Sequence, residues 1–98
     1  MHSNAKPSID ELAKTIVKTA TQKGIVIVLA ESCTGGMIAA ALTDIPGSSN
    51  VLDRCLVTYS NNAKTDLLGI TDDILVNYGA VSAETASAMT SGALSRTP

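Results

Sequence analysis

The apolar residues of this 98-residue chain follow two kinds of spacing, which together predict alternating helices and strands. Five consecutive apolar residues, 25–29, are typical of a strand buried on both faces of a parallel sheet. The run 55–59 predicts a second strand, because it is rich in residue types that strands favour. Between residue 9 and Gly24, apolar residues recur at helical spacing, which predicts an amphipathic helix.

Polar caps and glycines mark the ends of the predicted helices. Ser8 with Glu11 fits a capping box, and Gly24 is placed to end the first helix. Further helices are predicted over residues 36–43, 63–68, 72–77 and 83–94, with a turn at 44–49 and a short helix at 50–54. This alternation predicts an α/β fold, layered α/β/α around a central, largely parallel sheet. Two strands are fewer than a sheet usually has.

Composition narrows the function classes. The chain is 45% hydrophobic but has only two aromatic residues, so we expect one aliphatic core, as one domain or part of one. The net charge is -2 and no basic run occurs, which argues against nucleic-acid and membrane-surface partners. No apolar run is long enough to span a membrane, and residues 1–4 do not resemble a signal peptide, so we expect a cytoplasmic protein.

Reactive side chains gather between the first strand and the next helix, in the segment Ala30-Glu31-Ser32-Cys33-Thr34-Gly35-Gly36. Ligands of open α/β sheets bind at the carboxyl ends of strands, where helix N–H groups favour an anion or an oxyanion. The two glycines let the backbone approach a ligand closely. The plainer interpretation is an ordinary helix start, with Ser32 or Thr34 as the N-cap.

A serine nucleophile would need a base other than histidine here. The only histidine, His2, lies in the N-terminal tail, and lysine is the usual substitute. Lys64 lies one turn into the helix that follows the second strand. Parallel neighbouring strands would therefore bring Ser32 and Lys64 to one cleft, with Tyr59 between them. A lysine serves as a base only where its pKa falls by about three units, a cost of roughly 4 kcal/mol. The alternative is a solvated helix lysine.

The sequence leaves more than one role open for three other residues. Cys33 is a rival nucleophile, because a helix N-terminus lowers the pKa of a thiol. Glu31 could pair with Lys64, hold a substrate, or serve as a helix-dipole partner. Tyr59 could donate a hydrogen bond or only pack. With two cysteines, no CxxC and no carboxylate cluster, the sequence predicts no metal site.

Five motifs, in the same order and at similar spacing, make the chain resemble the CinA C-terminal domain family from about residue 8 to 94. One departure within these motifs is Asn61-Asn62, where the family has Asn-Glu. The motifs are Ala30-Glu31-Ser32-Cys33-Thr34-Gly35-Gly36, Leu42-Thr43-Asp44-Ile45-Pro46-Gly47-Ser48-Ser49, Val57-Thr58-Tyr59-Ser60-Asn61-Asn62-Ala63-Lys64, Leu67-Leu68-Gly69-Ile70 and Tyr78-Gly79-Ala80-Val81-Ser82.

The resemblance implies an amidase that converts nicotinamide mononucleotide to nicotinate mononucleotide and ammonia. The family's serine nucleophile falls on Ser32, its lysine base on Lys64 and its motif tyrosine on Tyr59. Backbone N–H groups at 33–36 would hold the oxyanion, or Thr34 to Gly36 would instead place the phosphate or ribose. The residues expected to contact substrate are Glu31, Cys33, Thr34, Gly35, Gly36, Ser60 and Asn61.

The resemblance also sets expectations for organisation and partners. We expect residues 1–7 to be a flexible tail and residues 8–98 to be the N-terminal portion of the family domain, whose further strand and glycine-rich loop lie beyond this chain. The resemblance implies a pyridine nucleotide as substrate and no metal or redox cofactor. An exposed edge of the sheet would favour self-association, so we expect a homo-oligomer. The alternative function is a non-catalytic nucleotide-binding module or a regulatory module connected with competence or DNA damage.

Overall fold

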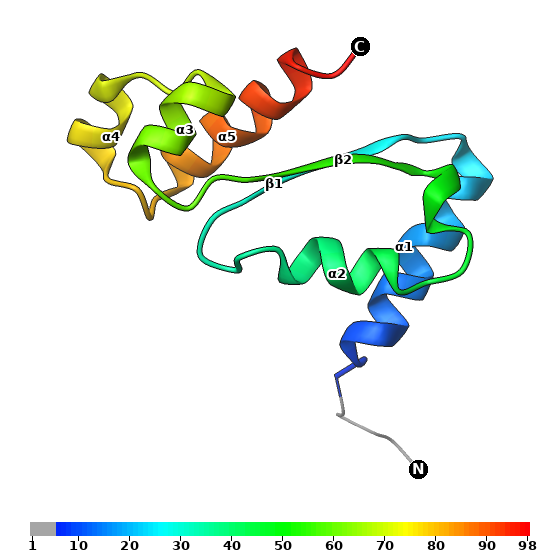
Figure 1. The fold of residues 1–98 in the computed structure, drawn as a ribbon. Coiled ribbons are helices and arrows are strands. Elements are labelled where there is room, and N and C mark those ends of the chain that lie inside the picture. Colours follow the sequence, from blue (N-terminus) through cyan, green and yellow to red (C-terminus); the bar gives the residue numbers. More distant parts are fainter. Residues whose placement is uncertain (1–5) are drawn as a thin grey trace.

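The structure, a computed structural model, describes residues 6–98, and in it two parallel strands lie between two groups of helices (Figure 1). Residues 1–5, most of the predicted tail, lie outside the described residues, and Lys6 and Pro7 are exposed. The elements in chain order are α1 (Ile9–Lys23), β1 (Ile27–Glu31), α2 (Met37–Thr43), the 3₁₀ helix η1 (Ser48–Asn50), β2 (Leu52–Val57), α3 (Asn61–Leu68), α4 (Asp72–Tyr78) and α5 (Ala83–Ser95).

The sheet confirms the predicted α/β class and its parallel pairing. β1 pairs with β2 from Ile27 opposite Leu52 to Glu31 opposite Val57, with an irregularity after Ile27. Helices α1 and α2 lie on one side of the strands and α3, α4 and α5 on the other (Figure 1). Because the strands are parallel and nearly in register, both end at the same edge, which is where the candidate site forms.

Alternate residues of β1 serve two separate cores, as expected for a strand covered on both faces. Ile27 and Leu29 pack with buried residues of α1 and α2, among them Val17 and Leu42. Val28 and Ala30 pack on the other face with the cluster of Leu68, Ile70, Met89 and Ala93. Both cores are almost wholly aliphatic, as the composition predicts, but the sheet divides the single core that we expected into two.

Both predicted strands were displaced from their observed positions. β1 begins at Ile27 rather than residue 25, because Ile25 N–H still bonds to Ala20 at the end of α1, and Val26 is 64% exposed. β2 spans 52–57 rather than 55–59, and the predicted short helix at 50–54 was wrong: η1 ends at Asn50 and β2 begins two residues later. The start of this strand was not predicted because the polar residues Asp53 and Arg54 interrupt the apolar pattern there.

The helix boundaries follow the predicted caps closely. The Ser8 hydroxyl accepts from Glu11 N–H at 3.1 Å, and Gly24 ends α1 in the left-handed conformation. Ser60 and Ser82 cap α3 and α5 in the same way.

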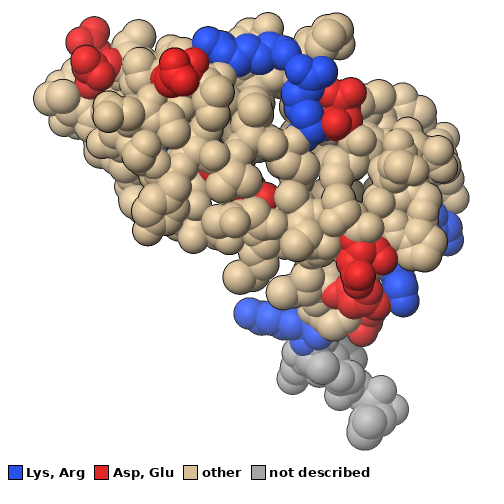
Figure 2. All heavy atoms as spheres, in the orientation of Figure 1, with Lys and Arg blue, Asp and Glu red and all other residues tan. Residues whose placement is uncertain are grey.

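On the face in Figure 2, lysine and arginine side chains lie at several separate places near the border.

One glycine sets how closely two helices approach. A Cβ built on Gly92 of α5 would overlap the backbone carbonyl oxygen of Leu68 at the end of α3. Backbone atoms cannot yield as a flexible side chain can, so α5 fits against α3 only with glycine at this position.

We therefore expect Gly92→Ala to lower the free energy of unfolding by about 1–3 kcal/mol, since overpacking outweighs the higher helix propensity of alanine. Thermal and urea unfolding followed by circular dichroism measure this. The matched control is Ser91→Ala at the exposed neighbouring position, which should be neutral or slightly stabilising. If the two variants were equally stable, the close approach would not constrain the fold.

Candidate active site at the paired strand ends

The ends of the two strands bring the predicted nucleophile and base together. Glu31 and Val57 are paired, and Thr58 N–H donates to the Glu31 carbonyl at 2.8 Å. Ser32 therefore leaves the sheet beside Thr58 and Tyr59. The chain then turns into α3, which carries Lys64 back toward the strand ends.

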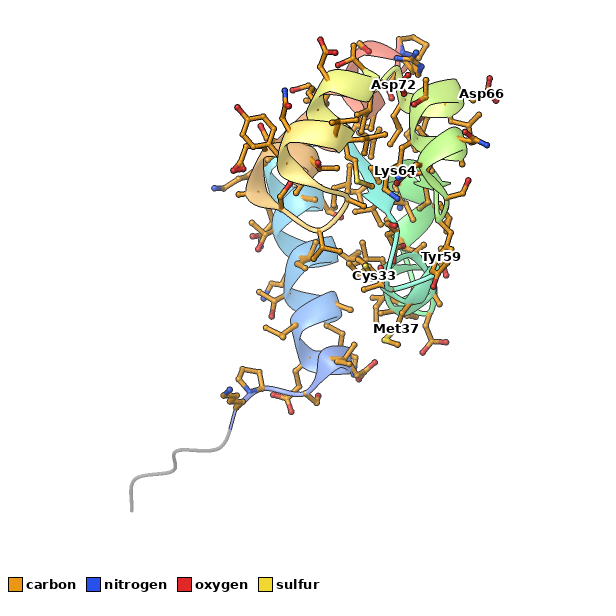
Figure 3. The ribbon with its side chains drawn as sticks, turned by 90° about the vertical axis from the view of Figure 1, so that its left-hand side faces the viewer. Cys33, Met37, Tyr59, Lys64, Asp66 and Asp72 are labelled. Atoms are coloured by element: carbon orange, nitrogen blue, oxygen red, sulfur yellow. The ribbon has the colours of Figure 1, made fainter. Side chains whose placement is uncertain are left out.

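Ser32 and Lys64 converge on one atom, the backbone carbonyl oxygen of Tyr59. Lys64 Nζ donates to it at 2.9 Å, and Ser32 Oγ lies 3.4 Å from it, a long hydrogen bond. Figure 3 shows Lys64 directed inward from α3, with Tyr59 nearby at the molecular border. Parallel pairing thus produces the juxtaposition that spacing predicted for these two side chains.

Lys64 is buried, so the alternative of a solvated lysine was wrong. Lys64 is 1% exposed, although lysines are rarely buried without a partner. The ion pairs found within residues 6–98 join Lys14 to Asp10 and Arg54 to Asp53. The Tyr59 carbonyl is therefore the polar group that holds the Lys64 amine in this part of the chain.

Tyr59, Ser60 and Asn61 were also predicted to belong to the site. They lie nearby, but their side chains do not face the junction of Ser32 and Lys64. Tyr59 is 74% exposed, so its carbonyl rather than its phenol lies at the Ser32–Lys64 junction. The Ser60 hydroxyl accepts from Ala63 N–H at 3.0 Å and caps α3. Asn61 is an exposed residue in the first turn of that helix.

Glu31 has a well-defined set of partners that spacing did not reveal. It is 3% exposed. One carboxylate oxygen accepts from Thr34 Oγ1 at 2.7 Å and from Ile38 N–H at 3.0 Å, and the other accepts from Ala39 N–H at 2.9 Å. Gly36, the N-cap of α2, has no side chain to cap the helix, so Glu31 caps it from the end of the sheet.

The environment of Glu31 fixes its charge state. Burial alone would raise the pKa of Glu31, but the hydrogen bonds from Thr34, Ala39 and Ile38 outweigh burial and hold that pKa below its ordinary value. Burial also raises the pKa of the Cys55 thiol, and the negative charge of Glu31 raises it further. Both cysteines are free, with Cys33 exposed and Cys55 partly buried.

The loop from Ser32 to Gly36 needs its two glycines and leaves two amides unused. Gly35 and Gly36 have φ values of 61° and 102°, in the range that favours glycine. Gly35 N–H donates to the Ser32 carbonyl at 2.9 Å. Within residues 6–98, the N–H groups of Cys33 and Thr34 have no backbone hydrogen-bond acceptor.

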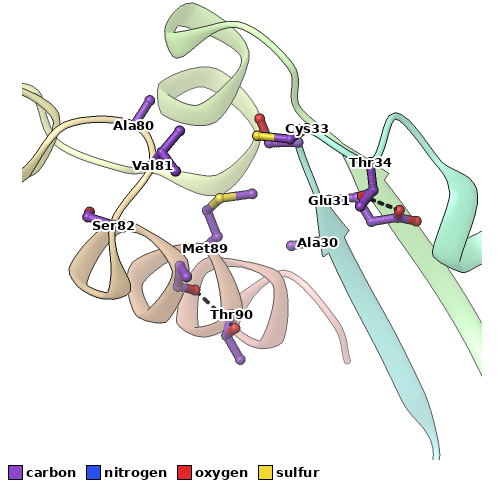
Figure 4. A pocket seen from close by; sticks show the side chains of 11 residues that line it. Ala30, Glu31, Cys33, Thr34, Ala80, Val81, Ser82, Met89 and Thr90 are labelled. Carbon is purple, nitrogen blue, oxygen red and sulfur yellow. Dashed lines mark hydrogen bonds between the residues drawn. The ribbon is translucent and has the colours of Figure 1, made fainter. Parts of the chain in front are cut away.

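A cleft of about 310 Å³ opens beside Ser32, between this loop and the segment that leads into α5. Figure 4 shows the Cys33 sulfur directed toward Met89 and Val81, whereas Glu31 extends away toward Thr34. The far wall was not predicted from the sequence, since small and apolar residues carry no chemical signal; only the Tyr78–Ser82 motif pointed to part of it. That wall consists of Ala80, Val81, Ser82, Ala86, Met89 and Thr90.

The described residues offer little to a metal ion. Across residues 6–98 there is no group of three or more histidine, cysteine, aspartate or glutamate side chains that could hold one. No helix in the same range is long and apolar enough to cross a membrane.

Comparison with known proteins gives a consistent result. The sequence model of the CinA C-terminal domain matches residues 9–98. A CinA-like protein of Syntrophotalea carbinolica is 52% identical over 83 residues, which are 85% of this chain and 20% of that protein. The chain thus spans about one fifth of the length of the curated relatives it matches.

Solved structures agree on the fold. The competence/damage inducible protein of Agrobacterium tumefaciens has a TM-score of 0.88 and 50% identity, covering 97% of this chain and 58% of that one. A CinA superfamily protein of Escherichia coli has a TM-score of 0.91 and 28% identity, covering 98% and 56%. Cytoplasmic location, self-association and the absence of nucleic-acid or membrane partners stay predictions.

The lowered pKa of Glu31 makes stability depend on pH. A carboxyl whose folded-state pKa lies below its unfolded value of about 4.3 stabilises the protein above that pH, and this contribution is lost as the pH falls through the folded-state pKa. We expect Glu31→Gln to lower the free energy of unfolding at pH 7 by about 1–3 kcal/mol and to flatten its fall in acid.

Urea unfolding at a series of pH values measures this difference. The control is Glu84→Gln, which alters an exposed glutamate in the first turn of α5 and should follow the unmodified chain. An acid loss of stability as steep in Glu31→Gln as in the unmodified chain would contradict the assignment.

Proposed function

Because this chain belongs to the CinA C-terminal domain family, we propose that its strand-end site is the serine–lysine centre of an amidase acting on nicotinamide mononucleotide. The observation that carries the proposal is the convergence of Ser32 and buried Lys64 on the Tyr59 carbonyl. A nucleophile and a base brought together by two strand ends are what acyl transfer requires.

In the proposed first step, the neutral Lys64 amine takes the Ser32 proton while Ser32 Oγ attacks the carboxamide carbon. The ion pairs found within residues 6–98 do not include Lys64, so no carboxylate in this range is paired with its amine. The Tyr59 carbonyl keeps the amine at the strand ends. The long Ser32 contact is compatible with this role, because catalytic hydrogen bonds often tighten only when substrate is bound.

The oxyanion formed by that attack would be stabilised by backbone amides. Cys33 and Thr34 N–H are the suitable donors, since the Gly35 N–H is already bonded to Ser32. Loss of one such donor typically costs about 3–4 kcal/mol of transition-state stabilisation. The C–N bond then breaks as the Lys64 ammonium donates its proton to the leaving amide nitrogen, which departs as ammonia. Water then hydrolyses the serine ester with Lys64 again as the base.

The cleft beside Ser32 supports a flat aromatic amide as the bound group. Its far wall is mainly small and apolar, with Met89 and Val81 facing the loop, and apolar walls of this kind suit a planar ring. None of its lining residues in the described chain is a lysine or arginine. The phosphate of the nucleotide would therefore lie outside this part of the cleft, or bind through the loop amides and hydroxyls.

Ammonia release from nicotinamide mononucleotide tests the proposal. We expect Ser32→Ala and Lys64→Met to reduce the rate by about 10³-fold or more, because the two residues act as a unit. Lys64→Met keeps an unbranched apolar chain at a buried position, and circular dichroism verifies that it folds. Lys18→Ala, at an exposed lysine of α1, is the matched control and should be unchanged.

Two outcomes would overturn the mechanism. Activity that survives Ser32→Ala but not Cys33→Ala would move the nucleophile to the thiol. A folded chain that is stabilised against heat by nicotinamide mononucleotide, yet releases no ammonia, would favour the nucleotide-binding module instead.

A further inference from the structure

We propose that Glu31 is a positioning residue for the nucleophile loop, and that it acts through the Thr34 hydroxyl and the first turn of α2 rather than by touching substrate. The inference rests on the proposed function only in taking Ser32 as the nucleophile. It concerns a side chain that the sequence left with three possible roles: an ion pair with Lys64, a contact with substrate, or a partner of the helix dipole.

The hydrogen bonds of Glu31 exclude an ion pair with Lys64. Both carboxylate oxygens of Glu31 are engaged by donors from the loop and from α2, at 2.7–3.0 Å. Ile27 and Leu29 lie on the same face of β1 as Glu31. Both belong to the core that packs against α1 and α2. Lys64 approaches from α3, on the opposite face of the sheet.

The same contacts argue against a direct substrate role. Glu31 is among the residues around the cleft, but its carboxylate extends toward Thr34, on the opposite side from Met89 and Val81 (Figure 4). It is also 3% exposed. A ligand in the cleft would have to displace charge-assisted hydrogen bonds to reach it, and these are the stronger class of hydrogen bond.

The geometry closes a ring around the reactive loop. Glu31 directly precedes Ser32, and its side chain reaches forward to Thr34 and to residues 38 and 39. The ring therefore contains the serine, both amides without an acceptor and both left-handed glycines. Fixing its two ends limits where Ser32 Oγ and the Cys33 and Thr34 N–H groups can lie, which is the preorganisation that an oxyanion site requires.

Cys33 offers a reporter of this loop that does not depend on catalysis. It is exposed, lies next to Ser32 and directs its sulfur into the cleft. In a Cys55→Ala background it is the only thiol of the chain. Its alkylation by iodoacetamide, an uncharged reagent, measured across pH, separates the rate constant of the thiolate from the fraction of thiolate present.

We expect Glu31→Gln and Thr34→Val each to change the Cys33 thiolate rate constant by about tenfold, the effect of losing one charge-assisted hydrogen bond. Thr34→Val keeps the carboxylate and its charge, so it isolates the clamp from the electrostatics. Glu84→Gln is the matched control and should match the parent. Rate constants equal to that of the parent in both variants would overturn the proposal. A changed rate constant in Glu31→Gln alone would also overturn it, because the loss of charge would then account for the whole effect.

Steady-state kinetics with nicotinamide mononucleotide supply the second readout. A positioning role predicts that Glu31→Gln lowers kcat by about tenfold with KM nearly unchanged. A raised KM with unchanged kcat would place Glu31 against the substrate and refute the proposal. If the unmodified chain releases no ammonia, the proposed function fails, while the Cys33 measurement still decides whether Glu31 holds the loop.

Discussion

The carboxylate of Glu31 is the contact on which the geometry of the strand-end site depends. It is a buried charge, and such a charge is tolerated only when hydrogen bonds replace the water it has lost. Thr34 and the first turn of α2 supply them. In return, Glu31 caps the seven-residue helix α2, whose N-cap residue is glycine and has no side chain to do so. The sheet, the loop and α2 are thereby joined at one side chain.

The second constraint is the parallel pairing of β1 and β2. Because Glu31 lies opposite Val57, the residues that follow each strand emerge together, and the Tyr59 carbonyl can receive both Ser32 and Lys64. A one-residue slip in register would turn Glu31 or Thr58 to the wrong face of the sheet. The position of the site thus depends on backbone pairing, whereas its chemistry depends on the residues at and after the end of each strand.

Much of this arrangement could be predicted from the sequence. The five-residue apolar run predicted a strand covered on both faces, and the caps at Ser8, Ser60 and Ser82 located three helices, because each signal is local. The start of β2 was missed because Asp53 and Arg54 are polar edge residues whose pairing depends on a distant strand. The partners of Glu31 and the far wall of the cleft were also missed: tertiary contacts of a lone acid, and of small apolar residues, leave no periodicity to detect.

Strand alternation has a further consequence for the two buried charged residue types. Glu31 and Lys64 lie at the same end of the sheet, yet they serve opposite faces, and each is held by hydrogen bonds rather than by the other. A carboxylate placed beside a lysine favours the charged amine, which is the wrong form for a base. Because Glu31 is directed toward α2, one strand end supplies a fixed negative charge that organises the loop, while Lys64 on the other face bonds to the Tyr59 carbonyl. This separation explains how an acidic residue can directly precede a nucleophile whose proposed base is a lysine.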